Sequence, residues 1–188
     1  TVRADLERSG LFKLVDPGSG TLDENAQVNY GDWKGRGADA LAAGSLTRGG
    51  DGRMEARFRL YDTQKQAALG GAVFVTGNDQ LRAAGHRIAD YIYEKLKNKK
   101  GVFSTRIAYI NVYERDGKRR YRLELSDIDG ARRTRLLDSS EPIMSAAWSP
   151  DGRSIAYVSF ESGQSQIYTQ NLQTGERKRL TDFQGING

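Results

Sequence analysis

The residue best suited to act as a general base at neutral pH is the single histidine, His86, which lies one helical turn before Asp90. A serine hydrolase would combine such a pair with a serine held in a strained turn between a strand and a helix. No serine lies in such a context, and one histidine cannot form a site with two histidine ligands. Because His86 falls outside the apolar stripe of its predicted helix, we expect it to make a hydrogen bond at the surface or between domains. We predict that the chain is not an enzyme.

The segment Asp127-Ile128-Asp129-Gly130 has some likeness to the start of a calcium-binding loop. It lacks the further acidic ligands and the terminal glutamate that such a loop needs. The sequence also contains no cysteine, which excludes disulfides and thiolate metal sites. We therefore expect no metal and no cofactor, and we predict a turn between two strands at this segment.

Basic residues could bind an anionic partner. The formal charge is +5 at pH 7, and basic residues cluster at Lys97 to Lys100, Arg115 to Arg120, Arg132 to Arg135 and Arg177 to Arg179. Such clusters can bind phosphates, but no aromatic stacking pattern or recognised nucleic-acid-binding module accompanies them. No segment is apolar over the roughly 18 residues that a membrane span needs. We expect neither a nucleic-acid partner nor a membrane span.

Residues 101 to 188 contain two copies of a pattern of strands and turns. Ile107-Ala108-Tyr109-Ile110 matches Ile155-Ala156-Tyr157-Val158, and the period of roughly 45 residues is typical of a β-propeller blade. Trp148-Ser149-Pro150-Asp151-Gly152 predicts a hairpin, because proline and glycine suit the corners of a turn. The predicted strands of the second blade are residues 143–148, 154–160, 166–172 and 176–181.

The predicted propeller is incomplete. A propeller closes with about four to eight blades, and the pattern gives two. The first of these lacks its first strand, because the domain before it runs directly into the second strand near Arg106. We expect the chain to be a fragment whose first blade is completed by a strand from outside it.

Residues 1 to 100 predict a separate α/β domain. The helix predicted over residues 78–97 has an apolar stripe that includes Leu81, Ile88 and Ile92, with Asn78 as its N-cap. Gly85 in mid-helix predicts the close approach of a sheet. A further helix is predicted at residues 2–9, a short one near Trp33, and strands at residues 11–15, 38–46, 54–61 and 67–75. A helix this close to the first residue suggests that the first strand of the domain is missing.

Several segments resemble the TolB family, the periplasmic components of the Tol-Pal envelope system. The resemblance rests on three segments: Leu81-Arg82-Ala83-Ala84-Gly85-His86 with Ala89 to Leu96, Gly101-Val102-Phe103-Ser104-Thr105-Arg106, and Tyr157-Val158-Ser159-Phe160-Glu161-Ser162-Gly163. It implies a mixed sheet with two helices in residues 1 to 100. It also implies a non-enzymatic periplasmic scaffold that docks the peptidoglycan-associated lipoprotein Pal and serves outer-membrane integrity, cell-division constriction and protein transport.

The family resemblance further implies inner-membrane Tol proteins as partners, through an N-terminal tail that lies outside this sequence, and colicins. The alternative is an accessory propeller of a prolyl oligopeptidase-like serine peptidase, since such propellers use the same Trp-Ser-Pro-Asp-Gly turn. The sequence after residue 188 would discriminate between them. More blades would favour the scaffold, and a Gly-x-Ser-x-Gly elbow would favour the peptidase.

Strand direction predicts where a partner docks. In a four-stranded meander the loops between the second and third strands share one face of the propeller with the connections between blades. The first domain enters at the start of a second strand, which places it on the opposite face and leaves this one open. The residues predicted to bind a partner on the open face are Glu141, Pro142, Ser162, Gly163, Gln164, Gln184, Gly185, Ile186 and Asn187.

Overall fold

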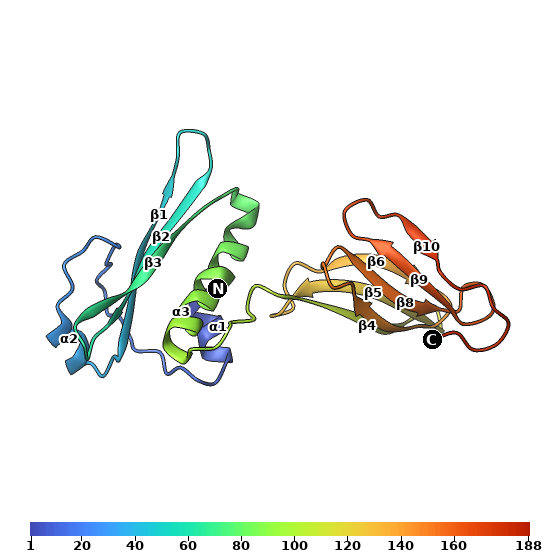
Figure 1. Cartoon of the computed structure of the whole chain (residues 1–188), viewed down its shortest axis with the longest axis horizontal. Helices are drawn as coiled ribbons and strands as arrows, with labels where there is room; N and C mark the ends of the chain where they lie inside the picture. Colours follow the sequence, from blue (N-terminus) through green and yellow to red (C-terminus); the bar gives the residue numbers. More distant parts are fainter. The chain divides into compact units, whose positions relative to one another are not determined.

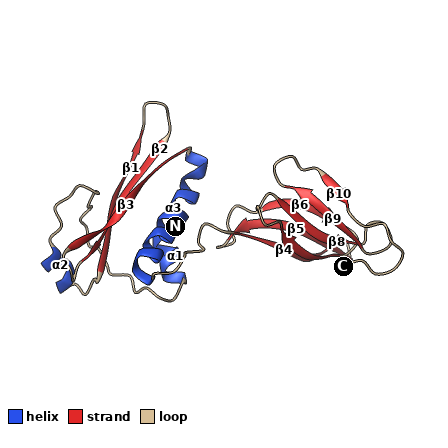
Figure 2. Ribbon diagram, viewed as in Figure 1, coloured by secondary structure: helices blue, strands red, loops and turns tan.

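The computed structural model describes all 188 residues, which form two compact units, Thr1–Ser104 and Thr105–Gly188 (Figure 1). The sequence-based boundary lies between residues 100 and 101. All three α-helices belong to the first unit, and the second consists of strands and loops (Figure 2). The predicted order of an α/β region followed by antiparallel β-sheets is confirmed. No helix combines the length and the apolar character needed to cross a membrane.

A three-stranded antiparallel sheet forms the centre of the first unit. Its strands β1 (Ala40–Arg48), β2 (Met54–Asp62) and β3 (Ala67–Thr76) lie in sequence order. Short turns join them, and a strand that follows a short turn can only pair antiparallel. The sheet is therefore antiparallel throughout, and the mixed sheet that the family resemblance implied is not present among these strands.

Helices α1 (Val2–Arg8) and α3 (Leu81–Lys97) pack against one face of this sheet (Figure 1). Phe58 and Leu60 of β2 meet Ala89 and Ile92 of α3 in the core, as the apolar stripe predicts. A second cluster gathers around Trp33 of the short helix α2 (Tyr30–Gly35) and includes residues of β1 and β2. The N-terminal sheet is thus held between two layers of apolar side chains.

Three local predictions for the first unit are wrong. Residues 11–15 form no strand, because Phe12 and Leu14 instead pack as isolated side chains against the core around α3. Asn78 is not the N-cap of α3, since a 3-10 turn occupies Asn78–Gln80 and the helix begins after it. Gly85 admits α1 rather than a sheet: a Cβ atom at this position would lie 2.9 Å from Cβ of Thr1.

The second unit contains two antiparallel sheets. The first has strands β4 (Arg106–Arg115), β5 (Lys118–Asp127) and β6 (Thr134–Ser139), in that order. The second has strands β7 (Ile143–Trp148), β8 (Ser154–Ser159), β9 (Gln166–Asn171) and β10 (Arg177–Arg179). The strand pattern predicted for two blades is present, including the absence of an inner strand from the first.

The two sheets of the second unit share one apolar core. Leu123 and Leu125 of β5 are buried together with Ile155 and Tyr157 of β8. Trp148 is partly buried against this cluster, which provides the neighbouring layer that its large ring requires. These open sheets are blades of an incomplete propeller.

Candidate functional site

His86 is buried. Its Nδ1 lies 2.6 Å from Oδ2 of Asp5 on α1, and the two residues are 1% and 0% exposed. This hydrogen bond joins helices α1 and α3 of the first unit. The sequence alone did not identify Asp5 as the partner of His86, because 81 positions separate the two residues in the chain.

Asp90 has a different role from the one its spacing suggested. Its carboxylate accepts hydrogen bonds from the backbone N–H groups of Phe103 and Ser104, at 2.7 and 3.0 Å. Phe103 is buried in the core around α3. Asp90 therefore fixes the segment that leaves α3, while His86 binds Asp5, and the hypothetical catalytic pair is divided between two structural contacts.

The acidic segment before Gly130 forms a turn. The N–H of Gly130 donates to the carbonyl of Asp127 at 2.9 Å, and Gly130 has a φ of +79°. Arg132 donates two hydrogen bonds to the Asp127 carboxylate, at 2.8 and 3.0 Å. Asp129 accepts from the N–H of Ala131. The carboxylates therefore stabilise a tight turn, as predicted for this segment.

Two arginines of β5, Arg120 and Arg122, contact an acid on the neighbouring strand. Arg122 donates to Asp138 on β6 at 2.7 Å and stacks 4.1 Å above the ring of Tyr113. Arg120 donates to the same carboxylate at 3.2 Å. The hydrogen bond from Arg122, followed by those from Tyr113 and Arg120, lowers the pKa of Asp138 to about 2. These two cations balance the charge of the Asp138 carboxylate.

The loops predicted to bind a partner meet at one end of the second blade. Ile143 pairs with Ser159, and Ser159 pairs with Gln166, so all three connections leave the sheet at the same end. The carbonyl of Pro142 accepts from the N–H of Phe160 at 3.1 Å. We call this set of loops, residues 139–142, 160–165 and 182–187, the blade-end surface.

Asn187 connects two of these loops. Its backbone N–H donates to Oγ of Ser165 at 2.9 Å, and its Nδ2 donates to the carbonyls of Ser165 and Phe183 at 3.1 and 3.0 Å. The structure thereby brings the nine predicted residues together, although their binding role is a separate question. Asn187 itself is half-buried by these contacts, which leaves the neighbouring side chains to face outward.

The most exposed apolar side chains of the chain also lie on the blade-end surface. Ile186 is 97% exposed and Phe183 is 70% exposed. Phe183 was missed by the sequence reasoning, and the available signal was an aromatic residue within a polar, glycine-rich segment. Exposed apolar groups on a rigid scaffold are typical of surfaces that bind other proteins.

An ion pair connects one loop of the blade-end surface, residues 160–165, to strand β10. Arg177 of β10 donates to both carboxylate oxygens of Glu161 at 2.9 Å and to the hydroxyl of Tyr157 at 2.7 Å. Burial opposes the charge of Arg177, but Glu161 and Tyr157 outweigh it and raise the pKa of the guanidinium. Gly163, at the tip of the same loop, has a φ of +84° and tolerates a side chain poorly. The ion pair therefore stabilises the start of this loop.

Comparison with known proteins covers both units. A family model described as the TolB beta propeller domain matches residues 93–188, and one described as the TolB amino-terminal domain matches residues 1–69. The Tol-Pal system protein TolB of Dechloromonas aromatica is 60% identical over 187 residues, which are 100% of this chain and 43% of that protein. The corresponding protein of Nitrosomonas europaea is 50% identical over 99% of this chain and 43% of its own length.

A solved structure gives the same result. The crystal structure of TolB from Acinetobacter baumannii superposes with a TM-score of 0.91 and 38% sequence identity, over 100% of this chain and 47% of the other. The chain thus spans less than half the length of the relatives that it matches. The matches to both family models and to relatives over the whole chain show that this chain belongs to the TolB family.

Proposed function

We propose that the chain is part of a periplasmic, non-enzymatic scaffold of the Tol-Pal system that docks the lipoprotein Pal through its propeller. The observation that carries this proposal is the 60% identity, over the whole chain, to a relative named Tol-Pal system protein TolB. The blade-end surface supplies the docking region, because it combines exposed Ile186 and Phe183 with loops held by hydrogen bonds.

A scaffold role agrees with how the reactive side chains are used. The single histidine is 1% exposed and bound to Asp5, so it is not accessible as a base for a substrate. Asp90 is engaged by two backbone N–H groups. The peptidase alternative is less well supported, because the TolB match includes the N-terminal domain as well as the propeller.

The wider role proposed is that of the Tol-Pal system in outer-membrane integrity, cell-division constriction and protein transport. Inner-membrane Tol proteins and colicins are the further partners proposed. Since the chain spans 43% of its curated relatives, these interactions belong to the whole protein and are tested there.

Charge and shape changes on the blade-end surface test the docking proposal. In the full-length protein, Glu141→Arg and Ile186→Asp should each weaken Pal binding by about tenfold or more, measured by isothermal titration calorimetry. Both side chains are exposed, so the thermal midpoint should stay within a few degrees. Ser162→Arg extends the test to the third loop without the backbone strain that a side chain at Gly163 would cause.

The matched control is Glu176→Arg, an exposed charge reversal in the loop at the other end of the same sheet. It should leave Pal binding unchanged. Normal binding by the blade-end variants, together with a loss in Glu176→Arg without unfolding, would show that Pal docks at the opposite end.

A further inference from the structure

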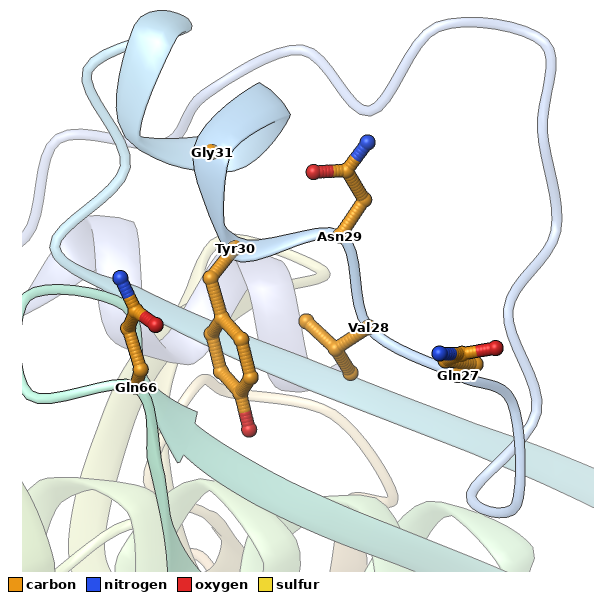
Figure 3. Close-up of a pocket in the computed structure, with 6 residues that line it drawn as sticks. All are labelled: Gln27, Val28, Asn29, Tyr30, Gly31 and Gln66. Carbon is orange, nitrogen blue, oxygen red and sulfur yellow. The ribbon is translucent and has the colours of Figure 1, made fainter.

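A shallow groove in the first unit has a lining unlike the rest of this charged surface (Figure 3). Its volume is about 540 Å³, within the range of small-molecule sites. The lining residues come from the segment that leads into α2 and from the turn between β2 and β3: Gln27, Val28, Asn29, Tyr30, Gly31 and Gln66. None of them is charged, although 28% of the residues of the chain are. The groove shares no residue with the blade-end surface.

The floor of the groove is a fixed aromatic ring. Tyr30 packs into the cluster around Trp33 and meets Tyr61 edge to face, with ring centroids 6.3 Å apart. Figure 3 shows its ring between Val28 on one side and Gln66 on the other. Because packing already fixes the Tyr30 ring, little further side-chain entropy is lost when a ligand covers it. The carbon atoms of Tyr30 and Val28 offer an apolar face.

Side-chain amides surround this floor. Gln27 and Gln66 are exposed, and their amides make no hydrogen bond within the protein. Asn29 uses its Oδ1 to accept from the N–H of Asp32 at 3.2 Å, which leaves its Nδ2 available. Each amide of Gln27 and Gln66 presents a donor and an acceptor side by side, a pattern that suits neighbouring hydroxyl groups.

Gln66 occupies a backbone position that favours glycine. Its φ is +52°, in the left-handed region, where a residue with a side chain carries a conformational cost. The strained position of this turn, Gln66, is thus also the one whose side chain lines the groove. A glycine at position 66 would relieve the backbone strain and remove the side-chain amide. The substitution therefore tests the role of the amide without an added cost to the fold.

We propose that this groove binds a neutral saccharide, with the apolar face of a sugar ring against Tyr30 and Val28 and its hydroxyl or acetamido groups bonded to the surrounding amides. A charged ligand is disfavoured, because no lining residue offers a counter-charge. An extended peptide is disfavoured as well, because no lining residue belongs to a β-strand with an edge to pair with.

The test uses the full-length protein with two neutral probes, a trisaccharide of N-acetylglucosamine and maltotriose, and with a capped trialanine peptide. Saturation-transfer NMR should show contact with at least one saccharide and none with the peptide. Gln66→Gly should weaken saccharide binding by about 2- to 10-fold, the worth of one hydrogen bond. The thermal midpoint should be unchanged or higher, since glycine relieves the positive φ.

The matched control is Gln64→Ala, which removes an exposed amide from the same turn but outside the groove. It should bind the saccharide like the unmodified protein. Gln27→Ala provides a second loss-of-amide variant on the opposite element. The proposal is overturned by the absence of saccharide contact, by unchanged affinity in both Gln66→Gly and Gln27→Ala, or by binding of the peptide alone.

Discussion

Asp5 and His86 show how polar side chains are used inside this fold. The pair lies between α1 and α3, and the 2.6 Å contact gives each buried group a hydrogen-bonding partner. Arg8, one turn along α1, adds a second contact to Asp5 at 3.3 Å. The hydrogen bond between these two buried side chains stabilises the packing of α1 against α3.

Asp138 gives the clearest pH-dependent prediction. Its folded pKa of about 2 lies below the ordinary value of 3.8, because Arg122 and its neighbours hydrogen-bond the ionised carboxylate. A lowered folded pKa stabilises the protein above the ordinary pKa, and this stabilisation is lost as the pH falls from about 4 to 2. Asp138→Asn should therefore lower the free energy of unfolding by about 1–2 kcal/mol at pH 7.

The difference between Asp138→Asn and the unmodified protein should shrink towards zero between pH 4 and pH 2, as measured by urea unfolding. The control is Asp116→Asn, whose side chain is 90% exposed and pairs only with the adjacent Arg115. It should change stability by less than about 0.5 kcal/mol. A deficit of constant size down to pH 2 would contradict the role assigned to the ionised carboxylate.

Among the elements, α3 organises the first unit and also fixes the chain that leaves it. The C-cap of the helix is Asn98, which adopts the left-handed conformation with a φ of +52°. Gly101 then lies directly against Asp90, and the backbone N–H groups of Phe103 and Ser104 donate to the Asp90 carboxylate. These contacts hold Phe103 in the core around α3.

Gly101→Ala tests the contacts between Asp90 and the segment that leaves α3. A Cβ atom at this position would lie 2.6 Å from Cα of Asp90, so the exit segment would have to move away from the helix. We expect a loss of about 1–3 kcal/mol in the free energy of unfolding. Faster amide hydrogen exchange at Phe103 and Ser104 should accompany it.

Gly20→Ala serves as the control for this substitution, because nothing lies within 4 Å of a Cβ atom added there and its φ is not in the left-handed region. It should be neutral or slightly stabilising, since alanine restricts the unfolded chain. Equal stability of the two variants would mean that the exit segment is not tightly held.

At the scale of the whole molecule, the second unit exposes apolar surface that a repeat protein normally covers with a neighbour. Leu180 and Met144 are 52% and 51% exposed, in addition to Phe183 and Ile186. Blades bury their faces against one another, and the chain spans 43% of its curated relatives. The remaining part of such a protein is therefore expected to cover some of these side chains.

This exposure predicts that the 188-residue chain alone binds more hydrophobic dye per molecule than the full-length protein does. Dye fluorescence and light scattering at matched molar concentration provide the measurement. A monomeric, dye-silent chain with a sharp unfolding transition would contradict the prediction.

The features that depend on near neighbours in the chain could be predicted from the sequence. The hairpin at Trp148 to Gly152 follows from turn chemistry: Ser149 bonds Asp151 at 2.6 Å, and Gly152 has a φ of +68°. The apolar stripe of α3 and the repeated pattern of the blades have the same local origin. Strand order in a meander also indicated which loops share one end of the blade.

The contacts between distant residues were decided only by the tertiary structure. Periodicity places His86 on a face of a helix, but it does not identify Asp5, 81 positions earlier, as the group that meets it. Glycine at position 85 predicts a close approach but does not identify Thr1 as the neighbour. The sequence around Phe12 is compatible with a strand, but in the structure Phe12 packs against the core around α3. Such contacts depend on which surfaces of whole helices and strands pack closely against one another. Local sequence propensity acts over only a few residues and therefore does not determine them.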